Sequence, residues 1–281
     1  MELNDLFSNK PKNEKSDNLQ KKDICVIDSF LISPLIRGLG RHFNIIEDKP
    51  DNCVKRLVEG QIDCAIISSI DYAAGKGSWK IIPELCIASR GANKNISLFF
   101  NTDIRELNTI ALDPGYNTSN VLLKIIMQEK YEVTPEYIEI KGSLQDKLKN
   151  ADAALLTGIQ AFHEQEDNQY CLDLGEEWFD LTGLPFVYAL WTVNDLSFSK
   201  EEAKNIIEAA SVMDQNIINS AKEISKETSF DWDLYHEYFD KRIYFKMGLE
   251  EQEALMEFYR YAFYHGFIEH IPDLHFLKNL N

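Results

Sequence analysis

The chain is short of cysteine, proline and positive charge. Five cysteines and eight prolines occur in 281 residues. The cysteines form no CxxC pair and lie mostly within apolar runs, so we expect reduced core thiols of a cytoplasmic protein, with neither a disulfide framework nor a metal site. Their positions are Cys25, Cys53, Cys64, Cys86 and Cys171.

Positive charge is scarce, because 29 Lys and Arg face 46 Asp and Glu, giving a net charge of -17. Such a balance argues against a nucleic-acid surface or an anionic membrane as partner, although a small anionic molecule can still bind where local donors outweigh the overall field. No apolar run of about 18 residues is present, so we expect no membrane span. Residues 1–22 lack apolar periodicity and are predicted to be a disordered tail rather than a signal peptide. We expect a monomer or homodimer.

The sharp catalytic motifs are also missing. GxSxG, HExxH, P-loop and GxGxxG patterns do not occur, and the six histidines lack metal-ligand spacing on any one element. Composition and spacing therefore indicate no metal site.

The most informative stretch that is present runs from Thr109 to Lys130. Its first four residues favour a strand, residues 113–115 form a turn, and Thr118 or Ser119 can cap a helix. A helix that begins above a strand end points unpaired N–H groups at that place and suits a carboxylate or phosphate. Asn117, Thr118 and Ser119 would add side-chain donors. The alternative is that the two hydroxyls only cap the helix.

Before this stretch, β-α-β-α-β alternation predicts a parallel sheet whose ligands bind at the carboxyl ends of its strands. Its expected strands cover residues 24–28, 42–46 and 63–67, and two more strands are expected at 85–89 and 96–100. Ser29 and Ser33 follow the first strand. Arg90 and Lys94 lie in a polar connection and are candidates to counter an acidic ligand, or are simply solvated.

After it, strands are expected at 137–140 and 151–156, and Thr157 would face the same crevice as the serines. Beyond Asn194 the chain changes to long amphipathic helices, opened by a capping box of Ser199 and Glu202. These patterns predict a two-lobed α/β protein with a polar cleft.

Several segments, taken in order, resemble the chorismate dehydratase family of menaquinone biosynthesis. The resemblance covers nearly everything after residue 23, and LTGLPFVYALW together with an LDxxxxTS pattern is its most specific part. The segments are IDSFLISPL (27–35), LVEGQIDCAIIS (57–68), CIASRGANKNISLFF (86–100), IALDPGYNTSNVLLKII (110–126), ADAALLTGIQA (151–161) and LTGLPFVYALW (181–191).

The resemblance implies a type II periplasmic-binding-protein-like fold with a C-terminal helical extension. One lobe would comprise 23–98 and 187–281, the other 99–186, with crossings near 97–101 and 185–189. It implies cofactor-free dehydration of chorismate to 3-[(1-carboxyvinyl)oxy]benzoate, the entry to the futalosine route, with Thr118 and Ser119 as a carboxylate cradle. The alternative is a non-catalytic binding protein for a small carboxylate on the same fold.

Three positions depart from the family pattern. A catalytic Asn is replaced by Leu31, a Ser by Asn95, and an Asp by Gln160. Since Leu cannot form a hydrogen bond, the orienting role would pass to Asn95, Ser29 or Ser33 in a rearranged site. The candidate catalytic residues are therefore Asn95, Ser29 and Ser33, and the candidate substrate-binding residues are Asn117, Thr118, Ser119, Lys94, Arg90 and Thr157.

Overall fold

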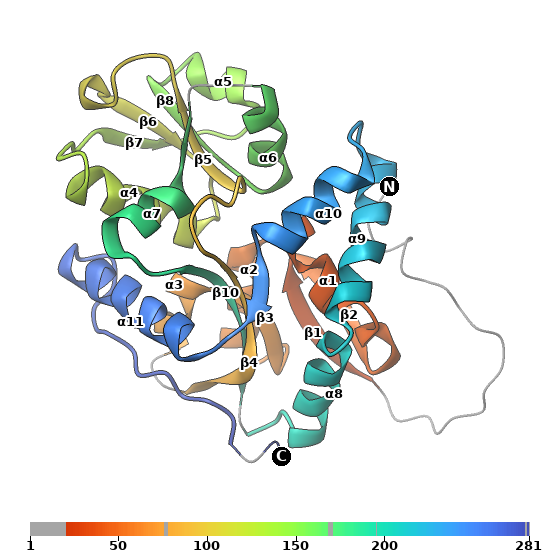
Figure 1. Ribbon diagram of the computed structural model, residues 1–281. Coiled ribbons are helices and arrows are strands. Elements are labelled where there is room, and N and C mark those ends of the chain that lie inside the picture. Colours follow the sequence, from red (N-terminus) through yellow and green to blue (C-terminus); the bar gives the residue numbers. More distant parts are fainter. Residues whose placement is uncertain (1–20, 76–77, 168–170, 195, 279, 281) are drawn as a thin grey trace.

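The chain folds into two α/β lobes, each built on its own mixed sheet (Figure 1). The computed structural model describes residues 21–75, 78–167, 171–194, 196–278 and 280. The tail predicted for residues 1–22 thus lies almost wholly outside the described residues, and the first strand begins at Lys22.

The first sheet has six strands within the described residues, in the order β11-β4-β10-β3-β1-β2. Apolar, β-branched runs such as CAIIS of β3 are buried on both faces, because helices cover the sheet. Its strands are β1 (Lys22–Ile27), β2 (Phe43–Asp48), β3 (Cys64–Ser68), β4 (Trp79–Ser89), β10 (Phe186–Asn194) and β11 (Tyr244–Lys246). We call this sheet, with α1 to α3 and α8 to α11, the first lobe.

The second sheet runs β7-β6-β8-β5-β9 and, with α4 to α7, forms the second lobe. Its strands are β5 (Ile96–Phe100), β6 (Thr109–Leu112), β7 (Glu136–Glu139), β8 (Ala153–Thr157) and β9 (Cys171–Asp173). All of β5 pairs in this sheet, so the chain leaves the first sheet over residues 90–95 and returns over 174–185. Both passages lie earlier in the chain than the crossings expected at 97–101 and 185–189.

The parallel pairing expected of the three strands over residues 24–67 is confirmed, whereas each sheet as a whole is mixed. Strands β1, β2 and β3 are parallel, but β10 lies antiparallel between β3 and β4. In the second sheet β6, β7 and β8 are parallel, whereas β5 is antiparallel to β8 and β9. Strand β5 is the first strand after the passage into the second lobe and β10 is the first after the return, and each runs against the parallel strands of its sheet.

The helices match most of the predicted spacing. The capping box at Ser199 is confirmed. The amphipathic stretch that follows it forms two helices, with a break after Ala210. Helix α1 is short and is flanked by 3-10 turns at Phe30–Ile32 and Leu39–Arg41. The helices are α1 (Ser33–Ile36), α2 (Pro50–Val58), α3 (Ser69–Tyr72), α4 (Asn117–Glu129), α5 (Leu144–Leu148), α6 (Gly158–Asp167), α7 (Leu174–Thr182), α8 (Lys200–Ala210), α9 (Met213–Glu227), α10 (Trp232–Lys241) and α11 (Leu249–Tyr264).

No helix in the described part of the chain is long and apolar enough to cross a membrane. All five cysteines are unpaired, and four of them are buried, as expected of core thiols.

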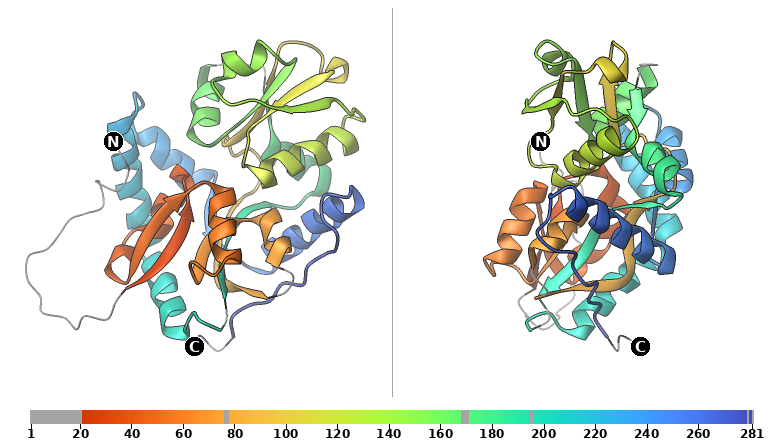
Figure 2. Two further views of the ribbon diagram at one scale, coloured as in Figure 1. Left: turned by 180° about the vertical axis from the view of Figure 1, so that it is seen from behind. Right: turned by 90° about the vertical axis from the view of Figure 1, so that its left-hand side faces the viewer.

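An aromatic cluster joins the lobes where α10 of the first lobe reaches toward α6 of the second (Figures 1 and 2). Phe162 of α6 packs edge-on against Tyr238, with ring centroids 4.9 Å apart, and lies 5.5 Å from Tyr235 and 6.0 Å from Phe30. The neighbouring His163 Nε2 is 2.7 Å from the Tyr235 hydroxyl. Packing and a hydrogen bond thus hold the lobes together at this end.

Replacing Phe162 by Ala tests this interlobe cluster. Phe162 is 1% exposed, so its truncation leaves a cavity and should lower the free energy of unfolding by about 3–5 kcal/mol in a urea titration. Phe263→Ala, at a side chain 47% exposed, is the matched control and should change stability by less than about 0.5 kcal/mol. Equal, small effects in both variants would show that the cluster contributes little.

Candidate functional site

A cavity of about 70 Å³ lies between the lobes, at the carboxyl ends of parallel strands from both sheets. Asp28 and Ser29 follow β1, Ser68 ends β3 and Thr157 ends β8, and all four line the cavity. Strand ends of an open α/β sheet are where its ligands usually bind. Since both lobes contribute to the wall, a ligand here would be enclosed by them.

The start of α4 forms one wall of this cavity. Tyr116 is the N-cap residue but gives no side-chain cap, and the first intrahelical bond runs from Asn120 N to Tyr116 O at 3.0 Å. The N–H groups of Asn117, Thr118 and Ser119 therefore lack intrahelical acceptors. The expectation that Thr118 or Ser119 caps the helix is wrong, because both lie inside its first turn.

Thr118 and Ser119 are both nearly buried and both line the cavity. Thr118 Oγ1 accepts a hydrogen bond from Ile70 N at 3.0 Å, and its own proton stays free to be donated. With the positive end of the helix dipole behind them, these groups favour an anion in the cavity.

A buried polar chain supports the same wall from inside the second lobe. Lys147, whose side chain is fully buried, pairs with Asp113 and donates to Leu155 O at 2.7 Å. Thr157 Oγ1 donates to Asp113 Oδ2 at 3.0 Å, and Tyr116 lines the cavity together with Thr157. Burial, with Asp113 and Asp28 nearby, raises the pKa of Tyr116. The phenol therefore stays neutral and can act as a donor to an anion.

Asn95 places a carboxamide in the cavity wall. Its backbone is fixed by two hydrogen bonds, since Asn95 N donates to Asn93 Oδ1 at 2.5 Å and Asn95 O accepts from Gly158 N at 2.8 Å. The side chain is 6% exposed, yet its oxygen has no hydrogen-bond partner among the described residues. Burying an amide oxygen without a hydrogen bond costs free energy, which indicates that a ligand supplies the missing donor.

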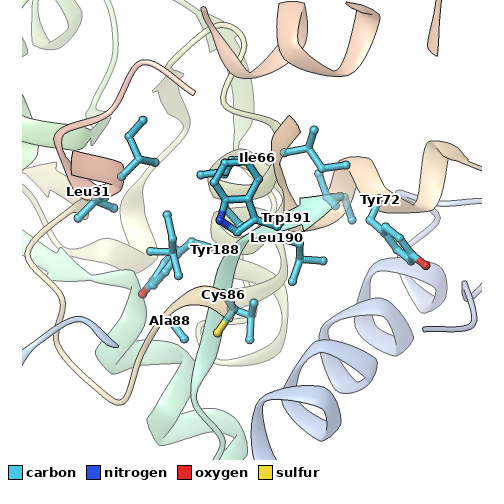
Figure 3. Close-up of a cluster of buried hydrophobic side chains, with 14 of the residues drawn as sticks. Leu31, Ile66, Tyr72, Cys86, Ala88, Tyr188, Leu190 and Trp191 are labelled. Atoms are coloured by element: carbon cyan, nitrogen blue, oxygen red, sulfur yellow. The ribbon is translucent and has the colours of Figure 1, made fainter. Parts of the chain in front are cut away.

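Leu31 contributes an apolar patch to the same cavity, as does Tyr188. Figure 3 shows both at the left-hand side of a buried hydrophobic cluster, with Trp191 and Leu190 further along. Ser29, whose hydroxyl accepts weakly from Leu31 N at 3.4 Å, lines the cavity beside them. Ser33 is buried in α1 and lies outside the lining.

The two expected cations lie elsewhere. Arg90 forms an ion pair with Glu250 and stacks over the Phe179 ring at 5.7 Å, so its charge is already engaged. Lys94 follows in the same connection with a positive φ of 56°, and its N–H donates to Asp173 Oδ2 at 2.6 Å. Neither residue lines the cavity. Within the part of the chain that the structure describes, no Lys or Arg does.

Hydrogen bonds from α4 also tie the lobes together next to the cavity. Asn117 Nδ2 donates to Asp51 Oδ1 at 2.9 Å and to Asp71 Oδ1 at 3.1 Å, both in the first lobe. Asn117, expected to bind the substrate, is thus engaged between lobes rather than in the cavity lining. At the far end of α4, His265 Nε2 lies 2.7 Å from Glu129 Oε1.

Sequence patterns missed Asp28, Tyr116 and Tyr188. Asp28 follows the same strand as Ser29, so the strand-end rule applied to Ser29 could have found it. Tyr116 stands inside a turn motif that hides its role as N-cap. Tyr188 lies in a continuous apolar strand, where no local signal separates it from the core.

In the described ranges, no group of three or more His, Cys, Asp or Glu side chains is arranged to hold a metal ion. The polar groups of the cavity are hydroxyls, carboxamide, backbone N–H and one carboxylate. This donor set suits a small molecule with carboxylate and hydroxyl groups.

Fold and cavity together define a periplasmic-binding-protein-like α/β protein. The periplasmic aliphatic sulphonate binding protein of Escherichia coli, for example, has a similar structure, with a TM-score of 0.61 over 90% of this chain and 95% of that one at 13% identity. At this level of identity the likeness concerns the fold alone.

Within that class, residues 25–264 match the model of the menaquinone biosynthesis family, and the chain belongs to this family. It is 27% identical over 226 residues to the chorismate dehydratase of Campylobacter jejuni, covering 80% of this chain and 86% of that one. It is also 27% identical to the chorismate dehydratase of Thermus thermophilus, over 53% of this chain and 60% of the relative's length.

The buried pair of Lys147 and Asp113 gives a testable energetic prediction. Asp113→Asn leaves a buried ammonium without its counter-charge and should cost about 3–5 kcal/mol in the free energy of unfolding. Adding Lys147→Met removes the unpaired charge and should recover most of that loss, as measured by denaturant titration of both variants. Additive losses in the double variant would mean that the two groups do not interact.

Proposed function

We propose that this protein is a chorismate dehydratase that converts chorismate to 3-[(1-carboxyvinyl)oxy]benzoate. The observation that carries the proposal is the cavity at the start of α4, where free helix N–H groups, two hydroxyls and the unpaired Asn95 carboxamide converge. Family membership and the two dehydratase relatives support it.

The reaction requires the protein mainly to position the substrate. Loss of the ring hydroxyl and a ring hydrogen makes the ring aromatic, so the reaction is downhill once the substrate is held in an eliminating geometry in a dry site. The start of α4 would bind one carboxylate, and the neutral Tyr116 phenol would donate to the same charge. The substrate's second carboxylate is itself a candidate base.

The departures at positions 31 and 95 fit a rebuilt site. The amide expected at position 31 is absent, but Asn95 supplies one from the opposite lobe in the lining of the same cavity. Leu31 then packs against the substrate ring. Ser29 is the second candidate for the orienting role, because its hydroxyl also lines the cavity.

The lobes must open for turnover. The cavity measures about 70 Å³, less than the dry cavity of about 150 Å³ that holds benzene, so chorismate would enter only after the lobes move apart. Opening would break the bonds of Asn117 and Thr118 to the first lobe and bend the two passages between sheets. This motion would admit substrate and release product.

The pathway and place of action follow from the same proposal. The product would enter the futalosine route of menaquinone biosynthesis, and the enzyme would act in the cytoplasm as a monomer or homodimer without cofactor.

A non-catalytic carboxylate-binding protein is the alternative, favoured by one observation, the loss of the hydrogen-bonding side chain at Leu31.

The assay that tests the proposal incubates purified protein with chorismate and a chelator and detects the enolpyruvyl benzoate by mass. We expect turnover. Asn95→Ala should lower kcat by about 10²–10³, the cost of one preorganised hydrogen-bonding group, with the fold intact. Leu31→Asn should not raise the rate, because the amide function is already supplied.

Asn216→Ala is the matched control, since Asn216 is equally buried but bonds Pro34 O and Ala209 O far from the cavity. It should lower stability and leave kcat unchanged. Thermal stabilisation by chorismate without product would instead establish the binding protein. A rate increase in Leu31→Asn would show that the family site is impaired rather than rebuilt.

A further inference from the structure

Ser68 and Asp71 form a hydrogen-bonded pair that spans the wall between the interlobe cavity and a second groove. Ser68 lines the cavity described above, and its hydroxyl donates to Asp71 Oδ2. Asp71 lines a second, open groove of about 570 Å³ on the other side of the wall. Both side chains are more than nine-tenths buried. The pair therefore connects the enclosed cavity to a solvent-accessible groove.

We propose that Asp71 supplies, through Ser68, the proton that the departing hydroxyl group of the substrate needs. The inference rests on the proposed dehydratase function and assigns it an acid. Ser68 is the group that contacts the substrate, and Asp71 acts through Ser68.

The proton transfer balances without any further reactant. The bond between the ring carbon and the hydroxyl oxygen breaks, its electron pair leaves on oxygen, and that oxygen takes the Ser68 proton to become water. Ser68 takes the Asp71 proton. The base removes the ring hydrogen as a proton, and water in the groove returns one proton to Asp71.

Asp71 is suited to hold a proton. Burial raises the pKa of its carboxyl, the hydrogen bonds from Ser68 and Asn117 oppose this rise, and the charge of Asp51 adds to it. While Asp71 is ionised, Ser68 donates to it. Once Asp71 is protonated, the carboxyl donates to the Ser68 oxygen and the serine proton becomes available to the cavity.

Several elements face Asp71. Asp51 of α2 shares Asn117 with it, Tyr259 of α11 donates to Ser69 O next to it, and the groove carries further charged groups. These groups are Lys124 of α4, Glu139 of β7, and Glu269 and His270 after α11.

The proposed relay predicts how kcat depends on pH. An acid must be protonated to act, so kcat should fall as pH rises through the pKa of Asp71, which burial places above the ordinary value of about 3.9. Asp71→Asn should lower kcat by about 10²–10⁴ and abolish that alkaline fall, because the amide has no proton to give.

Three further variants separate a relay from a structural role. Ser68→Ala should lose as much rate as Asp71→Asn, and the double variant should lose no more than either, as expected of groups that act as a unit. Asp51→Asn is the matched control, since it also removes a carboxylate from Asn117 but does not touch Ser68. It should keep the maximal rate and move the alkaline fall to lower pH, because a nearby negative charge is lost.

Calorimetric binding of 3-[(1-carboxyvinyl)oxy]benzoate checks that each variant is folded and keeps its cavity. Suppose that the wild type is active but the pH profile is unaltered in Asp71→Asn, or the losses are additive in the double variant. Either result overturns the relay and leaves the dehydratase function standing. A wild type that binds the product but never turns over chorismate overturns both.

Discussion

The interaction on which the rest of the structure depends is the meeting of the first turn of α4 with the first lobe. Thr118 bonds Ile70 N, and Asn117 bonds two carboxylates across the interface, so the helix start is held against the opposite strand ends. The unpaired N–H groups beside these contacts face the enclosed cavity. We propose that closure of the lobes forms the anion site, because both use the same turn of helix.

On the proposed function, this arrangement would allow a chain with a net charge of -17 to bind an acid. In the described lining the attraction comes from backbone N–H groups, hydroxyls and a phenol rather than from Arg or Lys. Fixed dipoles in a water-poor site act at short range, where the overall negative field matters less than the nearest donors. The buried Lys147 is offset by Asp113 and serves to orient Thr157.

Much of the architecture was predictable, because strand and helix periodicity depend on local residues. The strand ends at Ser29 and Thr157 were expected to share a crevice, and both line the cavity. Roles that depend on distant partners were not predictable. Nothing near Arg90 in the sequence reveals its pairing with Glu250, and nothing near Asn95 shows that its carboxamide oxygen is unpaired. The predicted helix cap was wrong for a similar reason. The Thr118 hydroxyl accepts a hydrogen bond from Ile70 N of the first lobe instead of capping its own helix.

The most direct test of this account is a crystal structure of the protein with 3-[(1-carboxyvinyl)oxy]benzoate bound. We predict that one carboxylate of the product lies within about 3.2 Å of the Thr118 and Ser119 N–H groups, with the Asn95 side chain bonded to the same molecule. A product molecule that binds elsewhere, or that leaves these N–H groups without a carboxylate, would contradict it.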